Sequence, residues 1–132
     1  MVEAALVLPI FFTVVLGIVE FGRAMMVSQL VTNASREGAR LAILDGTTNT
    51  EVEDFIYEFL LESVNVAEAD VGVTITVDPA TGNPDPADQV AAAGAGDIVT
   101  IRVSVPFNKV NYIPADYLEG KNLVGLSAMR HE

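Results

Sequence analysis

The chain lacks cysteine and tryptophan, and it has one histidine in 132 residues. The absence of cysteine excludes disulfides, thiolate catalysis and cysteine-ligated metals. The single histidine, His131, cannot by itself form a histidine-based metal centre. No nucleophile-and-base set can be assembled, and no glycine-rich phosphate loop is present. We therefore expect a protein without enzymatic activity and without a cofactor.

Basic residues are also scarce, with 7 Lys and Arg against 18 Asp and Glu, which gives a net charge of −11. A nucleic-acid binder is excluded, because phosphate neutralisation needs an excess of bases. A disordered acidic chain is excluded too, because 51% of the residues are hydrophobic. The negative charge and the hydrophobicity belong to different segments of the chain. Residues 45–97 hold twelve acids and no base, whereas residues 1–44 are neutral.

The longest apolar run covers residues 4–19 (AALVLPIFFTVVLGIV), which carry no charge. As a helix it would span about 24 Å, slightly less than the ~30 Å hydrocarbon layer of a bilayer. A cleavable secretory signal would need a basic start and a small-residue cleavage site. The chain starts with Met-Val-Glu and shows no such site. The run therefore favours a retained membrane or filament helix.

The helical pattern continues beyond this run. Apolar residues recur at helical spacing up to residue 44, and Asp45-Gly46 predicts the end of one helix over 4–44. Pro9 predicts a kink or a melted turn, either as a tolerated irregularity or as a functional hinge, and Gly17 is a second weak point. Small residues at four-residue spacing allow close approach of a partner helix or of the head: Ala34, Gly38 and Ala42.

Charged residues bracket the apolar run. Glu20 and Arg23 are three residues apart on the predicted helix, and we expect them to mark the level where it leaves the lipid. Glu3 precedes the run, so its carboxylate would lie in hydrocarbon or in a packed core and needs a cation. The amine of Met1, in the same chain or in a neighbouring subunit, can supply that charge.

The remainder predicts a small α+β head. Thr50 and Glu53 form a capping box before an amphipathic helix over 51–63. Alternating or apolar segments predict three antiparallel strands, at 71–77, 98–105 and 123–130. The expected layout is a long N-terminal helix packed on one further helix and a three-stranded sheet. We divide it into a hydrophobic helix (1–23), its amphipathic continuation (24–44) and an acidic head (45–132).

The loop over 78–97 contains three prolines and three glycines. Its oxygen-bearing side chains are weak candidates for calcium ligands, although their spacing does not match the EF-hand pattern. The alternative is an ordinary solvated loop. The candidates are Asp78, Asn83, Asp85 and Asp88.

The N-terminal segment resembles the TadE-like family of pilins and pseudopilins from tight-adherence (type IVc) pilus systems. Three stretches between residues 2 and 46 carry the resemblance: EAALVLP from Glu3, LGIVEFGR from Leu16 and LVTNASREGAR from Leu30. The last predicted strand, with Leu126-Ser127-Ala128-Met129-Arg130, is similar to the family's usual final strand. Glu3 stands third, where related pilins usually have an acidic residue fifth.

The resemblance implies a subunit that waits in the inner membrane and then polymerises through its hydrophobic helix into an extracellular helical filament. It also implies a short basic leader, removed by a prepilin peptidase, and a pilus assembly platform as a partner. We expect the printed sequence to be the processed protein. The predicted assembly residues are Met1, Glu3, Pro9, Gly17, Glu20 and Arg23. The alternatives are a minor pseudopilin or anchored accessory protein that primes assembly, and an anchored extracytoplasmic binding domain.

Overall fold

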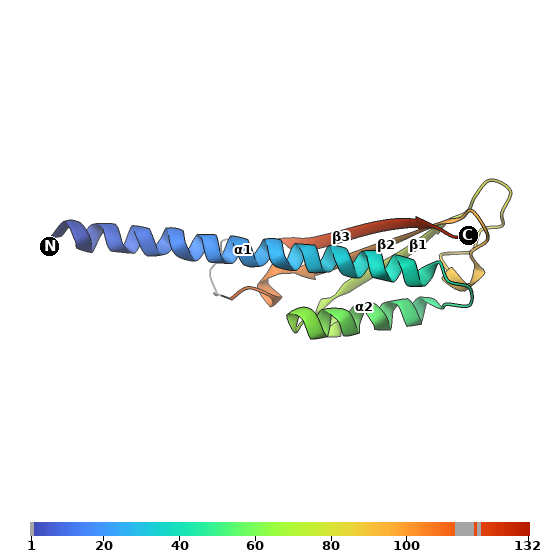
Figure 1. Ribbon diagram of the computed structural model, residues 1–132, viewed down its shortest axis with the longest axis horizontal. Helices are drawn as coiled ribbons and strands as arrows, with labels where there is room; N and C mark the ends of the chain where they lie inside the picture. Colours follow the sequence, from blue (N-terminus) through green and yellow to red (C-terminus); the bar gives the residue numbers. More distant parts are fainter. Residues whose placement is uncertain (1, 113–117, 119) are drawn as a thin grey trace.

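The computed structural model describes residues 2–112, 118 and 120–132, and Met1 lies outside them. Figure 1 shows an elongated molecule in which one helix projects from a small head. This helix, α1 (Val2–Ala42), has 41 residues. The N-terminus and the C-terminus lie at opposite ends of the molecule (Figure 1). The predicted α+β layout, with its long N-terminal helix, is confirmed.

Helix α1 runs without interruption through Pro9, so the melted turn expected there is wrong. Proline removes one intrahelical hydrogen bond. The Thr13 hydroxyl donates to the Pro9 carbonyl at 2.8 Å and adds a local bond one turn later. Figure 1 shows no sharp bend at this end of the helix. The helix ends at Ala42, and the chain turns at Gly46 with a φ of 83°.

Helix α2 (Asn49–Val64) starts two residues before the predicted start of 51. The capping box is formed by Thr48 and Glu51, so the assignment to Thr50 and Glu53 is wrong. Both pairs satisfy the same sequence pattern. The first is selected because the Asn49 side chain is tied to the long loop, where it accepts from the Val90 N–H and donates to the Asp88 carbonyl, each at 2.8 Å.

Three strands form one antiparallel sheet in the order β1 (Gly72–Asp78), β2 (Ile98–Pro106) and β3 (Asn122–Arg130). Ile75 pairs with Ile101, and Ile101 pairs with Ser127, so β2 is the central strand. The three strands occur within one residue of the positions that the sequence predicted. Short 3₁₀ turns lie between these elements, at Glu68–Asp70, Val90–Ala92 and Phe107–Lys109.

Both helices cover one face of the sheet. The inward residues of β2 are fully buried and alternate with outward residues such as Arg102. They join side chains from α1 and α2 in a single core that includes Val27, Val31, Ile56, Leu60, Val99, Ile101 and Val103. The second half of α1 is therefore a structural part of the head.

Strand β3 lies close to the backbone of α1. Gly125 of β3 faces the α1 backbone, and a Cβ atom placed there would lie 2.5 Å from the Val31 carbonyl oxygen and 2.8 Å from Thr32 Cα. Glycine is the residue that leaves this space free. Because Gly125 lacks a side chain, β3 can lie directly along α1, as Figure 1 shows.

Candidate functional site

The first half of α1 is an exposed apolar tail, which we define as residues 2–19. Its large hydrophobic side chains are between 36% and 83% exposed, and none of its residues is buried. Within the described residues, α1 is the one helix long and apolar enough to cross a membrane. Glu3 is the sole charged side chain of the tail. A surface of this extent marks a membrane or protein contact, because water solvates it poorly.

The head begins to cover α1 at Glu20, which is 2% exposed. Its Oε1 accepts from the backbone N–H of Tyr112 at 3.0 Å. One turn later, the Arg23 Nε donates to the Val110 carbonyl at 2.9 Å, and its guanidinium lies 4.5 Å from the Tyr112 ring centroid. Both side chains thus reach from the helix to one loop of the head. We call these four residues the junction, and it lies where the exposed tail ends.

Replacing the buried Glu20 by alanine should lower the free energy of unfolding by about 1–3 kcal/mol, because the Tyr112 N–H would lose its acceptor. The matched control is Glu37→Ala. Glu37 is exposed and forms a surface ion pair with Arg40 at 3.4 Å. Such pairs contribute about 0–1 kcal/mol. Denaturant unfolding of the purified variants in detergent measures both changes. Equal effects would show that the junction does not stabilise the head.

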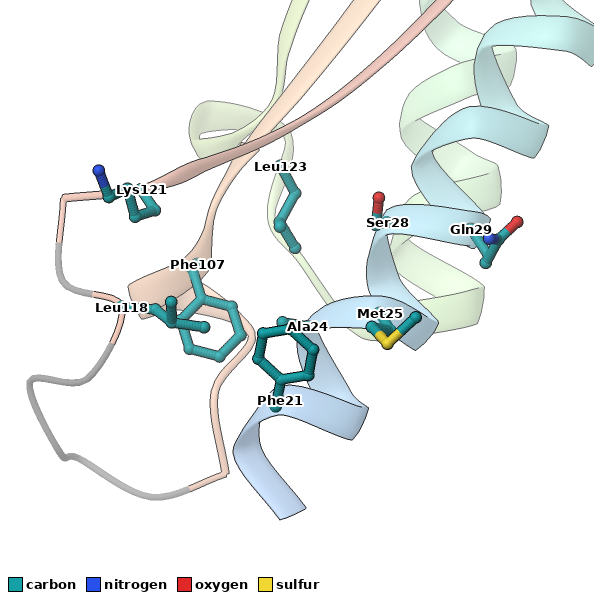
Figure 2. Close-up of a pocket in the computed structure, with 9 residues that line it drawn as sticks. All are labelled: Phe21, Ala24, Met25, Ser28, Gln29, Phe107, Leu118, Lys121 and Leu123. Atoms are coloured by element: carbon teal, nitrogen blue, oxygen red, sulfur yellow. The ribbon is translucent and has the colours of Figure 1, made fainter. Parts of the chain in front are cut away.

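An apolar groove of about 290 Å³ lies beside the junction. Figure 2 shows the side chains that line it: Phe21, Ala24, Met25, Ser28, Gln29, Phe107, Leu118, Lys121 and Leu123. Phe21 and Met25 are 60% and 57% exposed, whereas Phe107 at the base is 2% exposed. Lys121 lies at the edge of the group. Because α1 supplies one wall, the groove continues the exposed surface of the tail into the head.

The predicted packing residues lie deeper in the head. Ala34, Gly38 and Ala42 are all buried. A Cβ atom at Gly38 would lie 2.7 Å from the Ile56 Cδ1 atom, so this glycine lets α2 approach α1 closely. Gly17, in contrast, has open space around it, with nothing within 4 Å of such an atom. Within the subunit, the small residues of α1 therefore pack against the head.

A second polar cluster closes the far end of the head, around the fully buried Asp97. The Asp97 carboxylate accepts from the N–H of Ala80 at 2.9 Å, from the N–H of Gly94 at 2.7 Å and from the Asn83 amide. The Asp97 carbonyl accepts from the N–H of His131 at 2.8 Å. The carboxylate thus holds the long loop together, and the backbone of Asp97 links this loop to the C-terminal residues.

The pKa of Asp97 lies below the ordinary value, chiefly because the Ala80 N–H stabilises the charged form, with Asn83, Gly94 and then His131 adding to the effect. Burial opposes the shift without cancelling it. A lowered folded pKa means that the stabilisation is complete above the unfolded Asp pKa of about 3.9 and is lost as the pH falls through the folded value.

Asp97→Asn should therefore lower the thermal midpoint at pH 7. The difference between the natural chain and this variant should shrink as the pH is lowered below about 4. Circular dichroism melts between pH 7 and pH 2 measure that difference. Asp54→Asn, on the exposed surface of α2, is the control. A difference for Asp97 that stays constant with pH would contradict the assigned role of its charge.

The four calcium candidates take different positions. Asp88 Oδ1 accepts from the Val77 N–H, Asp85 Oδ1 accepts from the Ala87 N–H, and Asn83 binds Asp97. Asp78 is the exposed last residue of β1. Across residues 2–112, 118 and 120–132, no group of three acidic or histidine side chains is suited to a metal ion. The observed hydrogen bonds give Asn83, Asp85 and Asp88 a role in shaping the loop.

Several functional residues could not be found from the sequence. Val110 and Tyr112 at the junction, and Phe107, Leu118 and Lys121 at the groove, lie between the second and third predicted strands, where the sequence predicted no helix or strand. The structure places them beside residues of α1 that are far away in the sequence; the Arg23 to Val110 bond, for example, spans 87 positions. The one available signal was the aromatic and apolar content of this segment.

Comparison with known proteins supports the resemblance in the N-terminal part of the chain. The family model described as TadE-like protein matches residues 1–40. This match covers the tail, Glu20 and Arg23 of the junction, and most of the buried half of α1. No curated protein and no solved structure matches the chain. The similarity to the TadE-like family is therefore confirmed for residues 1–40.

Proposed function

We propose that this chain, with its TadE-like N-terminal segment, is a structural pilin subunit of a tight-adherence (type IVc-like) pilus. It polymerises through its N-terminal helix into an extracellular filament and is not an enzyme. The observation that carries the proposal is the division of α1: residues 2–19 are uncovered and apolar, while the following residues form the core of a folded head. The family match over residues 1–40 supports a protein associated with Tad pili.

The uncovered tail explains how one chain serves two environments. In the inner membrane, lipid covers the tail and the head lies outside. During assembly, tails of other copies replace the lipid. Exchanging lipid for like helices moves the tail between two apolar surroundings, whereas exposing it to water would cost about 25 cal/mol per Å². The assembly platform therefore needs to extract the tail directly into a bundle.

The acidic head suits the outside of such a filament. Residues 45–97 carry twelve acids and no base. Heads that surround a bundle of apolar tails would give the filament a strongly negative surface, which keeps separate filaments soluble. A subunit that binds the next one through a different surface forms an open helical array rather than a closed dimer. A prepilin peptidase and the assembly platform are the other proposed partners.

Electron microscopy of cells that lack this chain tests the proposal. Loss of all filaments, with recovery on re-expression, is expected of the structural subunit. Fewer filaments would favour the minor pseudopilin or priming protein. Unchanged filaments would favour an anchored binding domain and would overturn the proposal.

Glu3→Ala tests the role of the charged end of the tail. It should lower filament yield by about tenfold or more without reducing membrane insertion. Inside the filament, the cation that pairs with this carboxylate would be left buried without a partner. Immunoblots of sheared filaments and of membrane fractions measure the two quantities. The control is Glu37→Ala, an exposed site on the same helix. Normal filament yield with Glu3→Ala would refute this role.

A further inference from the structure

We infer that the groove beside the junction binds the tail of a second copy of this chain, with Glu3 of that copy next to Lys121 at the edge of the groove. This inference rests on the proposed function and names the surface through which the subunits would join. Three features carry it: the continuity between groove and tail, the rigidity of the groove, and the distribution of charge.

The apolar surface of the tail runs directly into the groove. Ile18, Phe21 and Met25 follow one another at helical spacing, and they are 66%, 60% and 57% exposed. An occupant that covers this stripe along the tail therefore also reaches the groove. The opposite wall comes from Leu118 and Leu123 of the head. A long apolar helix can cover both parts at once.

The groove is preformed by the backbone. The Phe107 N–H donates to the Lys121 carbonyl at 2.9 Å, and the Lys121 N–H donates to the Leu118 carbonyl at 3.2 Å. These bonds fix the edge of the groove to its buried base. Its volume of about 290 Å³ is at the lower limit for small-molecule sites. An open, apolar groove of this size suits the side-chain ridge of a helix.

Charge selects the occupant. The tail contains one charged residue, Glu3, and the groove contains one, Lys121. Lys121 is exposed and forms no ion pair with the residues that the structure describes. On a helix, Val7, Ile10 and Val14 lie on the same face as Glu3. A tail that places Glu3 beside Lys121 thus presents an uninterrupted apolar ridge to Phe21 and Met25. A lipid acyl chain would match the apolar groove, but it has no charged group that corresponds to Glu3 and could pair with Lys121.

Cysteine cross-linking in intact filaments tests the contact, since the natural chain has no cysteine. A chain with both Val7→Cys and Met25→Cys should form a ladder of disulfide-linked multimers on mild oxidation. The two positions are about 27 Å apart on one helix, so they cannot link within a chain. Each single variant should form dimers at most. The control pair is Val7→Cys with Glu58→Cys, which is exposed on α2 away from the groove.

Normal filaments without a ladder from the Val7 and Met25 pair would overturn the inference and leave the proposed function intact. Protection of Met25→Cys from a water-soluble thiol reagent, without this cross-link, would identify lipid as the occupant and would also overturn it. If filaments from cells with the natural chain do not contain this chain, the proposed function itself fails.

A charge exchange gives an independent readout when the cysteine variants do not assemble. Glu3→Lys and Lys121→Glu should each lower filament yield by more than about tenfold, because each places like charges together. The double variant restores the opposite-charge pair and should recover to within about threefold of the natural chain. Recovery supports the contact. A double variant no better than the worse single variant contradicts it.

Discussion

Gly125→Ala should lower the free energy of unfolding of the head by about 3 kcal/mol, at the upper end of the usual cost of overpacking. The added methyl group would lie 2.5 Å from the Val31 carbonyl oxygen and 2.7 Å from its carbonyl carbon. Both atoms belong to the backbone of α1, so no side-chain rotation can relieve the contact. Either β3 or the helix has to move. Denaturant unfolding followed by circular dichroism measures the loss.

Gly72→Ala is the matched control for this variant. Gly72 is also a strand glycine, but the nearest atom to an added methyl group is the Ser104 hydroxyl, at 2.6 Å. That hydroxyl can rotate, so we expect a loss below about 1 kcal/mol. A Gly125→Ala loss no greater than that of Gly72→Ala would show that β3 does not pack on α1 as closely as described. The consequence would extend to function, because α1 connects the head to the tail.

Removal of the tail should produce a soluble, monomeric head that no longer forms filaments. A chain that starts at Glu20 keeps the junction, the groove and the whole core, since the core residues of α1 begin at Ala24. The free energy of unfolding should match that of the full chain in detergent within about 0.5 kcal/mol, because the lost residues are exposed. Size-exclusion chromatography and denaturant unfolding measure these properties.

An insoluble or unfolded product would contradict the division of α1 into a tail and a structural half. A shorter chain that starts at Met26 sharpens this test. It lacks Glu20, Arg23 and Ala24, so the Tyr112 N–H and the Val110 carbonyl lose their partners. We expect this second chain to be less stable than the first by a few kcal/mol, since a hydrogen-bonding group left without its partner costs about 1–3 kcal/mol.

The periodicity of the sequence predicted the elements of the fold well. The apolar run and its amphipathic continuation predicted α1, and alternation predicted β1 and β2. These features are local, because each depends on neighbours within a turn or a strand. The predicted start of α2 was wrong because a local pattern alone cannot distinguish two equivalent caps. Thr48 and Thr50 offer equivalent capping boxes, and the choice depends on contacts of Asn49 with a loop that is 39 residues away.

Long-range contacts could not be predicted. The sequence suggested that Glu20 and Arg23 form an intrahelical pair at a membrane boundary, whereas the structure directs both side chains to residues 110–112. Gly125 lies in a stretch that only predicted a strand, and nothing local indicates that its missing side chain admits the α1 backbone. The buried Asp97 lies at the end of an acidic segment where exposed carboxylates are the expectation. Its role depends on donors supplied by two turns of the folded loop.

The structure also refines the division of the chain by environment. The sequence predicted a hydrophobic helix over residues 1–23 and an amphipathic continuation over 24–44, and in the structure the side chains of α1 begin to be covered at Glu20. From Glu20 to its end at Ala42, α1 contributes to the core of the head. Glu20 and Arg23 bond to the head at the point from which the tail projects.

The central claim is that the tail is covered by other copies of this chain in a filament. Helical reconstruction of filaments sheared from cells, at a resolution that shows side chains, tests it most directly. We expect this chain to be the repeating subunit, with residues 4–19 packed among identical helices and the acidic heads outside. Filaments built from another protein, with this chain remaining in the membrane fraction, would contradict the claim.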